Sequence, residues 1–444
     1  MNVSRLLLGG TVLLLVGAGL VAAASPPVEA GDDGATREID ACTTITESGT
    51  YELVGDLSLP AGTQTDDELV CIRVRTDGVT LDGSGYAVAG RNGTGTGILI
   101  RRSEIETISD VTIENVTVEN WGTGVALFGG EEGVHFRAVT ARTNADRGIY
   151  LQDSTGVEVR DIAATDNRIG MSLRGVGRST FRGLELRDNA DTGLFSTGGV
   201  FRNTFDDVRA TGNGGSVYFS SGIYLSTDTF DNVFEGVSVR NNTGAGLLFS
   251  DSSQNTVRDA VVEDTDGPGV VGDFAGNDSL LNVTVRDNAG PAILRQMGTF
   301  SADRVDLGGG ITVGFTDEPV SVARVDTEKL ATLAGGALAS AGVNVTGVAA
   351  AVTVTFGGFD STALDGGVEV RRFDGREWRP VANASVDPRS GTITATVRED
   401  GVVAVVQSDD APAGGDEAGV VRVPDDTIAG HGSAGCRAGE RPGG

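Results

Sequence analysis

The chain has 444 residues, and its 62 Asp and Glu outnumber its 34 Lys and Arg, giving a formal net charge of −28. This charge disfavours nucleic acid and anionic membrane surfaces as partners, because both repel a surface rich in carboxylates. Carboxylates also keep a surface hydrated, so the acidity by itself indicates solubility rather than a ligand. Lys329 is the single lysine, which leaves arginine as almost the only cationic side chain.

The N-terminus predicts export. Arg5 precedes an apolar run that extends to Ala24, and Ala22 to Ala24 supply small residues for cleavage. Residues 1–24 are therefore interpreted as a Sec-type signal peptide. We expect a secreted or cell-surface protein without a membrane span after cleavage. An uncleaved N-terminal anchor is the alternative, because the apolar run approaches the length of a membrane span.

Two cysteines follow a linker at 25–40 rich in Pro, Gly and acidic residues. Cys42 and Cys71 flank a short extended segment in an entry region, 41–96, that we interpret as an N-terminal cap with a first partial coil. Because the chain is expected to be exported, the first interpretation is a disulfide between them, and the alternative is two separate buried thiols. Cys436 lies in the tail without an evident partner.

One short phrase, a glycine followed by alternating apolar residues, recurs every 22 to 29 residues. Gly148-Ile149-Tyr150-Leu151 is a clear copy, and the phrase begins at Gly97, Gly124, Gly148, Gly170, Gly193, Gly222, Gly246 and Gly269. Each repeat holds three short segments of strand type, separated by Gly, Asn, Asp and Thr. A fixed period of this size indicates a solenoid, and three strands per repeat predict a parallel β-helix over 97–310.

A second pattern accompanies the repeat. An asparagine follows the third strand segment at one spacing, at Asn167, Asn189, Asn213, Asn242 and Asn288. We expect this asparagine to adopt the left-handed backbone of a tight turn, and the stacked side chains to form hydrogen bonds between coils.

From these motifs the chain resembles the right-handed parallel β-helix repeat proteins over residues 70–307. Relatives of that group include the NosD-type copper-associated family and the carbohydrate-binding and sugar-hydrolase β-helices. The acidic composition resembles that of secreted proteins from halophilic archaea. The resemblance implies an all-β fold with a right-handed parallel β-helix of about eight or nine coils. It does not imply one activity, since the fold hosts several chemistries.

After Leu307 the repeat stops. Strand-like runs at 320–325, 349–356, 368–373, 392–397 and 402–406 predict a small antiparallel β-sandwich over 311–407. Residues 408–444 are rich in Gly, Ala, Pro and Asp and are expected to be a disordered tail.

The first strand of each repeat predicts a stripe on the outside of the β-helix. Its outward residues are Ala126, Tyr150, Ser172, Phe195, Tyr224 and Leu248, followed by Gln152 and Arg174 in the next outward positions. Aromatic rings stack on sugars, and Arg or amide groups bind hydroxyls and carboxylates. The glycan-binding candidates are Tyr150, Gln152, Arg174, Phe195, Tyr218 and Tyr224, with Tyr218 in an insertion at 214–221. The alternative is that aromatic residues simply suit exposed β-sheet.

Catalytic residues are not evident. A lysine base is excluded because Lys329 is outside the repeat, and the weak candidates are Arg174, Asp153 and Asp228. The pair Asp206–Asp207 is interpreted as a turn. Calcium is chemically possible but lacks a motif, and no copper-ligand spacing is present, so no cofactor or metal is expected.

Three functions remain open from the sequence. The first is a non-catalytic envelope or glycan-binding module whose partner is an extracellular or envelope polysaccharide. The second is a polysaccharide-modifying enzyme, such as a lyase or an epimerase, that acts along the groove of the β-helix. The third is a NosD-like accessory factor for the maturation of a metal enzyme.

Overall fold

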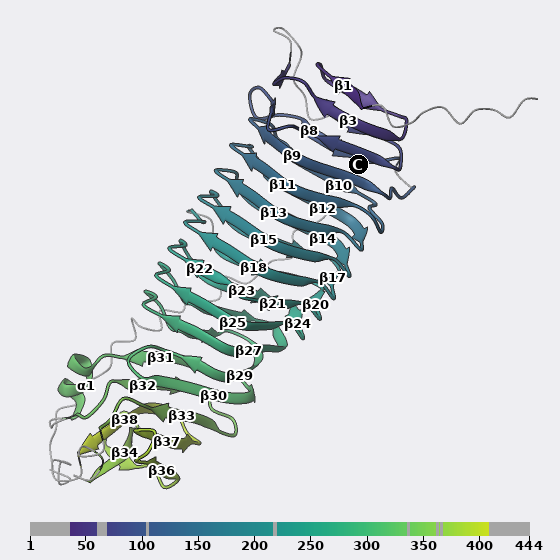
Figure 1. The fold of residues 1–444 in the computed structure, drawn as a ribbon. Helices are drawn as coiled ribbons and strands as arrows, with labels where there is room; N and C mark the ends of the chain where they lie inside the picture. Colours follow the sequence, from purple (N-terminus) through teal and green to yellow (C-terminus); the bar gives the residue numbers. More distant parts are fainter. Residues whose placement is uncertain are drawn as a thin grey trace, which may run out of the picture. The chain divides into compact units, whose positions relative to one another are not determined.

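The structure, a computed structural model, describes residues 36–59, 69–103, 106–215, 220–334, 338–360, 364 and 367–407, without the side chains of 332–334. They belong to one compact unit that begins at Thr36 and are almost wholly strands (Figure 1). The predicted signal peptide, most of the predicted linker and the predicted tail lie outside the described residues. Within the described part, no helix has the length and apolar content of a membrane span.

The first strand of every coil joins one parallel sheet, which we call the first sheet. Its strands are β2 (Thr43–Ile45), β5 (Val70–Val74), β8 (Thr96–Ile100), β10 (Thr123–Phe128), β12 (Arg147–Thr155), β14 (Ile169–Gly177), β16 (Thr192–Thr197), β19 (Ser221–Leu225), β23 (Ala245–Ser250), β26 (Val270–Asp273) and β28 (Ile293–Arg295). Their register places the apolar residues of successive glycine phrases opposite one another, for example Val125 against Ile149 and Ile149 against Met171. The predicted parallel β-helix is confirmed by this pairing.

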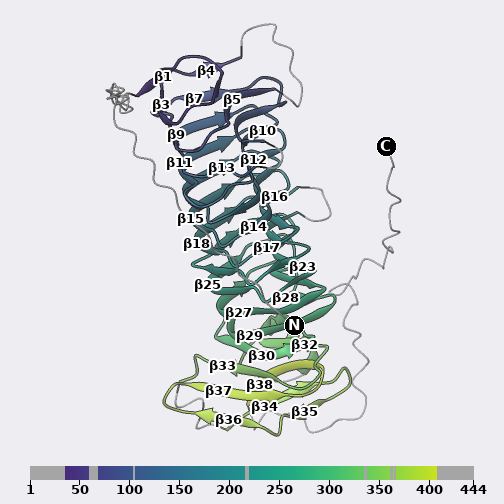
Figure 2. The ribbon, with the colours of Figure 1, turned by 90° about the vertical axis from the view of Figure 1, so that its right-hand side faces the viewer.

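The remaining strands of each coil form the other sides of the stack (Figure 2). They are β1 (Arg37–Ile39), β3 (Gly49–Leu53), β6 (Val79–Asp82), β9 (Val111–Glu119), β11 (His135–Arg142), β13 (Glu158–Thr165), β15 (Thr180–Arg187), β18 (Thr204–Thr211), β21 (Val233–Glu235), β22 (Ser238–Arg240), β25 (Thr256–Glu263), β27 (Ala275–Arg286) and β29 (Gly298–Asp306). Shorter strands are β4 (Leu57–Ser58), β7 (Ala87–Ala89), β17 (Val200–Phe201), β20 (Thr229–Phe230) and β24 (Ser252–Ser253). Each of these strands pairs in parallel with a strand of a neighbouring coil, and β29 at the end of the stack also pairs in antiparallel fashion with β30.

The interior of the coils is filled by layers of buried side chains. Phe181, Phe205 and Phe234 stack coil upon coil, with ring centroids 4.6 and 4.3 Å apart, and all three are nearly inaccessible to solvent. Offset stacking of rings adds to the free energy that their burial contributes. The alternation of apolar and polar residues in the sequence therefore corresponds to an inside and an outside of the solenoid.

The stack has about ten turns, more than the eight or nine predicted. The difference arises because the segment interpreted as a cap already forms coils: β2 pairs with β5, and β5 pairs with β8, all in parallel. Parallel pairing extends even to β1, which lies at the end of the segment predicted as linker. The glycine phrase is degenerate in these first coils, so the sequence pattern did not reveal them.

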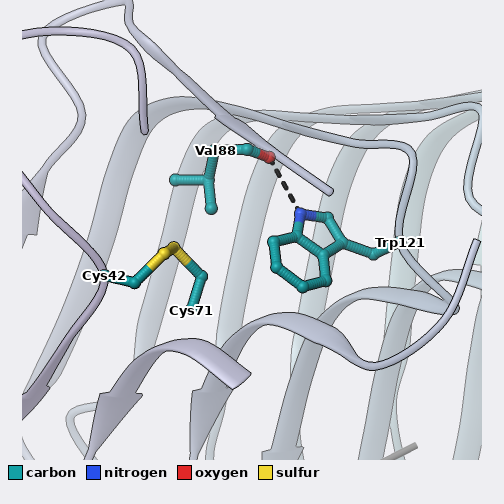
Figure 3. The surroundings of a disulfide bond; sticks show 4 residues. All are labelled: Cys42, Cys71, Val88 and Trp121. Atoms are coloured by element: carbon teal, nitrogen blue, oxygen red, sulfur yellow. Dashed lines mark hydrogen bonds between the residues drawn. A yellow bond between two sulfur atoms is a disulfide. The ribbon is translucent and has the colours of Figure 1, made fainter. Parts of the chain in front are cut away.

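The predicted disulfide is present between Cys42 and Cys71 (Figure 3). Cys71 is in β5 and is buried, whereas Cys42 immediately precedes β2. Beside the bridge, the buried indole of Trp121 donates a hydrogen bond from its Nε1 to the carbonyl oxygen of Val88, at 3.0 Å. The bridge therefore fastens two adjacent coils at the start of the stack.

Each long strand outside the first sheet is bent by one residue in the left-handed conformation. Asn115, Asp161, Asp207, Asp259 and Asn282 have φ between 51° and 59° and recur at this bend. Asn and Asp tolerate such a backbone better than most residues do. The pair Asp206–Asp207, interpreted from the sequence as a turn, lies instead within strand β18, at the point where the left-handed Asp207 bends the backbone.

The predicted asparagine ladder is confirmed, but the predicted conformation of its residues is wrong. Asn144, Asn167, Asn189, Asn213 and Asn242 are buried, and each Oδ1 from Asn167 onward accepts hydrogen bonds from both the backbone N–H and the Nδ2 of the preceding asparagine. The left-handed φ belongs to the residue before the ladder position, such as Asp166 and Asp188. The left-handed residue turns the chain, so that the following asparagine points inward.

The ladder explains why most repeats begin with glycine. A Cβ atom on Gly148, Gly170 or Gly193 would come within 2.8 to 2.9 Å of the Nδ2 atom of a ladder asparagine. It would also come within 2.6 to 2.7 Å of the carbonyl oxygen of the glycine in the next coil. Real side chains do not tolerate such contacts. The glycine phrase and the asparagine pattern are therefore structurally linked. The lack of a side chain at the glycine leaves space for the side-chain amide of the ladder asparagine.

A second ladder follows the first sheet and was not predicted. Asn203 Oδ1 accepts from the N–H of Ser179, Asn232 Oδ1 accepts from the N–H of Asn203, and the same pattern continues through Asn255 to Asp278. All five side chains are buried. The second ladder thus ends on a carboxylate, because Asp278 stands where the coils above have asparagine.

Asp278 should make stability depend on pH. Burial raises the pKa of this carboxyl to about 6, although hydrogen bonds from Asn255 and Ser252 oppose the shift. Because the folded pKa lies above the unfolded value, the stabilising contribution of the protonated form is lost as pH rises through 6. Between pH 5 and pH 8 the free energy of unfolding should fall by about 1.5 kcal/mol from this group alone.

Urea unfolding of Asp278→Asn tests this assignment. The amide oxygen preserves both bonds from Asn255, so the variant should lose that pH dependence and be more stable than the wild type at pH 8. Asp251→Asn, at an exposed turn residue, is the matched control and should behave as the wild type. If the free energy of unfolding depends on pH equally in Asp278→Asn and in the wild type, Asp278 is not the cause of that dependence.

Antiparallel strands follow the last coil. They are β30 (Ile311–Glu318), β31 (Ser321–Val325), β32 (Gly342–Thr346), β33 (Val352–Phe356), β34 (Val368–Phe373), β35 (Trp378–Pro380), β36 (Ala384–Asp387), β37 (Thr392–Val397) and β38 (Gly401–Gln407), with the short helix α1 (Thr327–Ala334) after β31. β30 pairs with β29, and β31 pairs with β28, so this segment continues the sheets of the coils. The predicted strand runs are confirmed, whereas a separate β-sandwich stays a prediction.

Candidate functional site

The outward stripe on the first sheet is in register as predicted. Tyr150 lies opposite Ala126 and Ser172, and Phe195 lies opposite Ser172 and Tyr224. The alternation explains this placement, because the neighbours of Tyr150, Ile149 and Leu151, point inward and are fully buried. The stripe therefore runs along the coils at one position per strand. The stripe is less open than the sequence suggested, since its members Ala126, Ser172 and Leu248 are buried.

The N-terminal half of the stripe is polar and aromatic. The guanidinium of Arg147 lies over the ring of Tyr150, 4.6 Å from its centroid, and is held by Asp146 at 2.7 Å. The Tyr150 hydroxyl donates to Oε1 of Gln152, and Nε2 of Gln152 donates to Asp153 at 2.9 Å. This network fixes Tyr150 and Gln152 with a cation beside them, which suits recognition of hydroxyl-bearing or anionic groups.

Phe128 and Arg101 extend this half toward the N-terminus. The rings of Phe128 and Tyr150 meet edge to face at 5.5 Å, and Arg101 lies over Phe128 at 5.2 Å. Neither Phe128, Arg101 nor Arg147 was among the predicted site residues. The signal that could have found them is the same alternation, because Phe128 and Arg101 hold the outward position that Gln152 holds in its own strand.

The C-terminal half of the stripe is apolar. Leu248 and Val271 are outward residues of β23 and β26, yet they are buried in a small cluster with Ala245, against which Tyr224 and Leu294 pack. Tyr224 also contacts Phe195, with centroids 5.2 Å apart. Tyr224 and Phe195 are thus half-buried packing residues as well as ligand candidates. The candidate Tyr218 lies outside the described residues.

Of the weak catalytic candidates, Asp153 lies in β12 and Arg174 in β14, whereas Asp228 lies in a turn. Asp153 and Asp228 have left-handed φ values of 49° and 57°, and Gly175 and Asp251 hold the same kind of position in other coils. Oδ1 of Asp153 would lie 2.5 Å from a Cβ atom on Gly175, so this carboxylate covers the next turn. Arg174 is exposed beside that glycine. The left-handed backbone, which Asp tolerates better than most residues do, explains the residue type at Asp153 and Asp228 without a catalytic role.

The comparisons with known proteins agree with this geometry. A family profile described as "Right handed beta helix region" matches residues 148–303. A second, described as "Periplasmic copper-binding protein (NosD)", matches residues 62–222. The chain is a parallel β-helix repeat protein. No curated protein matches this β-helix protein.

Several solved structures are similar to the β-helix protein at low identity. The A-module of the mannuronan C-5 epimerase AlgE4 of Azotobacter vinelandii is 20% identical over 55% of this chain and 72% of that chain, with a TM-score of 0.44. The Dettilon tailspike protein is 11% identical over 83% and 86% of the two chains, with a TM-score of 0.43. ORF18 of Geobacillus virus E2 is 11% identical over 88% and 73%, with a TM-score of 0.46. At these values, the likenesses assign no activity or ligand to this β-helix protein.

Copper is implied by the description of the NosD profile, but the residues present do not fit it. Within the matched segment, Met171 is buried in the core and Cys71 is in the disulfide. Nδ1 of His135 lies 3.2 Å from Glu158. Imidazole and sulfur ligands would have to converge to bind copper, and the described part of this β-helix protein has no group of three potential metal-ligating side chains.

Proposed function

We propose that this chain is an exported, non-catalytic β-helix module that binds a glycan along the N-terminal half of the outward stripe. The observation that carries the proposal is the fixed arrangement of Tyr150, Gln152 and Arg147 along the single strand β12. A half-exposed ring offers a surface for a sugar, while the amide and the guanidinium offer hydrogen bonds to its substituents. The left-handed backbone at Asp153 and Asp228, which accounts for an aspartate at each position, supports binding over catalysis.

A glycan array followed by calorimetry tests the proposal. The measurement is made at a salt concentration at which circular dichroism shows β-structure. For any glycan bound, Tyr150→Ala should weaken binding roughly 3- to 10-fold, the value of one aromatic contact. Tyr150→Phe, which keeps the ring, should lose less. Tyr86→Ala is the matched control, because Tyr86 is an exposed tyrosine in a turn outside the stripe.

Two results would contradict this function. The first is an array in which folded protein binds no glycan, and the second is unchanged affinity in Tyr150→Ala. Incubation with polyuronides separates binding from catalysis, since a lyase would release products with a new double bond that absorb ultraviolet light. Release of such products, abolished by Arg174→Ala, would replace the binding role by an enzymatic one.

A further inference from the structure

The outward face continues past Phe128 into the first coils, where it becomes strongly basic. In β5, Arg73 stands between Ile72 and Val74, both of which point inward and are fully buried. Arg73 is therefore outward, in the column that leads through Leu99 and Ala126 to Tyr150. Arg75 directly follows β5, and Arg101 directly follows β8. Three arginines thus share the outward face of two adjacent strands.

These arginines repel one another. The pairing of Val74 with Ile100 brings Arg75 and Arg101, the residues that directly follow them, side by side. The pKa of Arg73 is lowered, first by burial and then by the positive charges of Arg75 and Arg101. Several other arginines of the coils are paired across strands, as Arg142 is with Glu119 and Arg258 is with Glu235. In the part of the chain that the structure describes, Arg73 and Arg75 form no ion pair with a carboxylate.

Such a cluster is unexpected in a chain with a net charge of −28. Acidic residues outnumber basic ones, so carboxylate partners for Arg73 and Arg75 would be easy to supply on this surface. A group of like charges is unfavourable by itself, and an anion that binds between the charges removes the repulsion while it gains charge-assisted hydrogen bonds. The planar guanidinium matches carboxylate and sulfate groups through two parallel hydrogen bonds.

We propose that Arg73, Arg75 and Arg101 bind the carboxylate or sulfate groups of an acidic polysaccharide. This inference rests on the proposed function, because it makes the same ligand continue from Tyr150 across the first coils. Strands stack at about 4.8 Å, so the three steps from β12 to β5 span roughly 14 Å, a distance that requires an oligosaccharide rather than a single sugar. Arg101 over Phe128 is the link between the charged and the aromatic parts.

Nucleic acid is also a polyanion, but the charges favour an acidic glycan. Binding of nucleic acid draws on many phosphate contacts along a long basic surface. Here the basic face is short, and the rest of the surface is acidic. The phosphates of a nucleic acid that extend beyond the three arginines would be repelled by the carboxylates of the surrounding surface. A glycan with more widely spaced charges needs to bring only a few anionic groups to the arginines.

Binding assays with probes of different charge test this inference. The probes are neutral dextran, dextran sulfate, polygalacturonate and single-stranded DNA, each titrated over a salt series in which the wild type stays folded. The wild type should prefer an anionic glycan to dextran, and Arg73→Gln with Arg75→Gln should weaken that binding at least 10-fold. Arg73→Lys with Arg75→Lys, which keeps the charge but loses the paired hydrogen bonds of the guanidinium, should weaken binding less than the glutamine variant does, which separates loss of charge from loss of folding.

The matched control is Arg182→Gln with Arg258→Gln, which removes two exposed arginines from β15 and β25. This variant should bind as the wild type does. If dextran binds as well as the acidic glycans and the Arg73–Arg75 variant is unaffected, the anionic ligand is wrong while glycan binding stands. If no glycan binds, the proposed function itself fails. Equal affinity for DNA and acidic glycans would also overturn the inference.

Discussion

Replacement of Asn189 by alanine should destabilise the protein by about 4 kcal/mol. The Oδ1 atom of Asn189 accepts from the N–H and Nδ2 of Asn167, and its Nδ2 atom donates to the carbonyl oxygen of Ala164 and to Asn213. Its removal leaves buried polar groups without partners in two adjacent coils, and each such group costs about 1–3 kcal/mol. Urea unfolding followed by circular dichroism measures the loss.

Asp166→Asn is the control for this experiment. Asp166 directly precedes a ladder position and is left-handed, but its side chain is exposed. Asparagine tolerates the same backbone, so the change should stay within about 0.5 kcal/mol. A loss of under 1 kcal/mol in Asn189→Ala would show that the ladder is not a major source of stability.

Removal of the disulfide by Cys42→Ala with Cys71→Ala should lower the free energy of unfolding by about 3.5 kcal/mol. The two cysteines are 29 residues apart. In the chain-entropy model, a bridge that closes a loop of that size lowers the conformational entropy of the unfolded chain, and this loss of entropy stabilises the folded state by about 3.5 kcal/mol. The bridge also joins adjacent coils near buried Trp121 (Figure 3), so the first coils should lose protection from hydrogen exchange before the central ones do.

Chemical reduction of the wild type should reproduce this effect, because it opens the same loop. Cys436→Ser is the control and should leave the unfolding free energy unchanged, since Cys436 is not part of the bridge. If reduction does not lower the urea concentration at the midpoint of unfolding, the bridge does not stabilise the protein by closing this loop.

Much of the coil could be predicted from the sequence because one side-chain type recurs at one spacing. The glycine phrase and the asparagine pattern identified the first sheet and the ladder. Their connection could not be predicted, because the contact between Gly170 and Asn189 depends on the exact turn. The second ladder was missed for a different reason: its members change from serine through asparagine to Asp278, so no single residue type marks the column.

For the candidate site, the alternation of apolar and polar residues predicted which side chains point outward, but not how deeply these side chains are buried. It placed Tyr150 and Tyr224 on one outward face, as the register shows. It could not show that Tyr224 packs with buried Leu248, because burial on an outer face depends on neighbouring coils. Arg73 was missed because the first coils lack a clear glycine phrase, and without that phrase the column could not be extended to them.

Disulfide trapping between coils tests the central claim, the parallel in-register stack, most directly. Thr140 pairs with Ala163, and Ala163 pairs with Glu185, on successive strands of β11, β13 and β15. In a Cys436→Ser background, cysteines at 140 and 163, or at 163 and 185, should cross-link readily, because neighbouring Cα atoms lie within disulfide range. Cysteines at 140 and 185 are two steps apart and should not. Efficient cross-linking of the 140–185 pair, or none in the neighbouring pairs, would contradict the stacked β-helix.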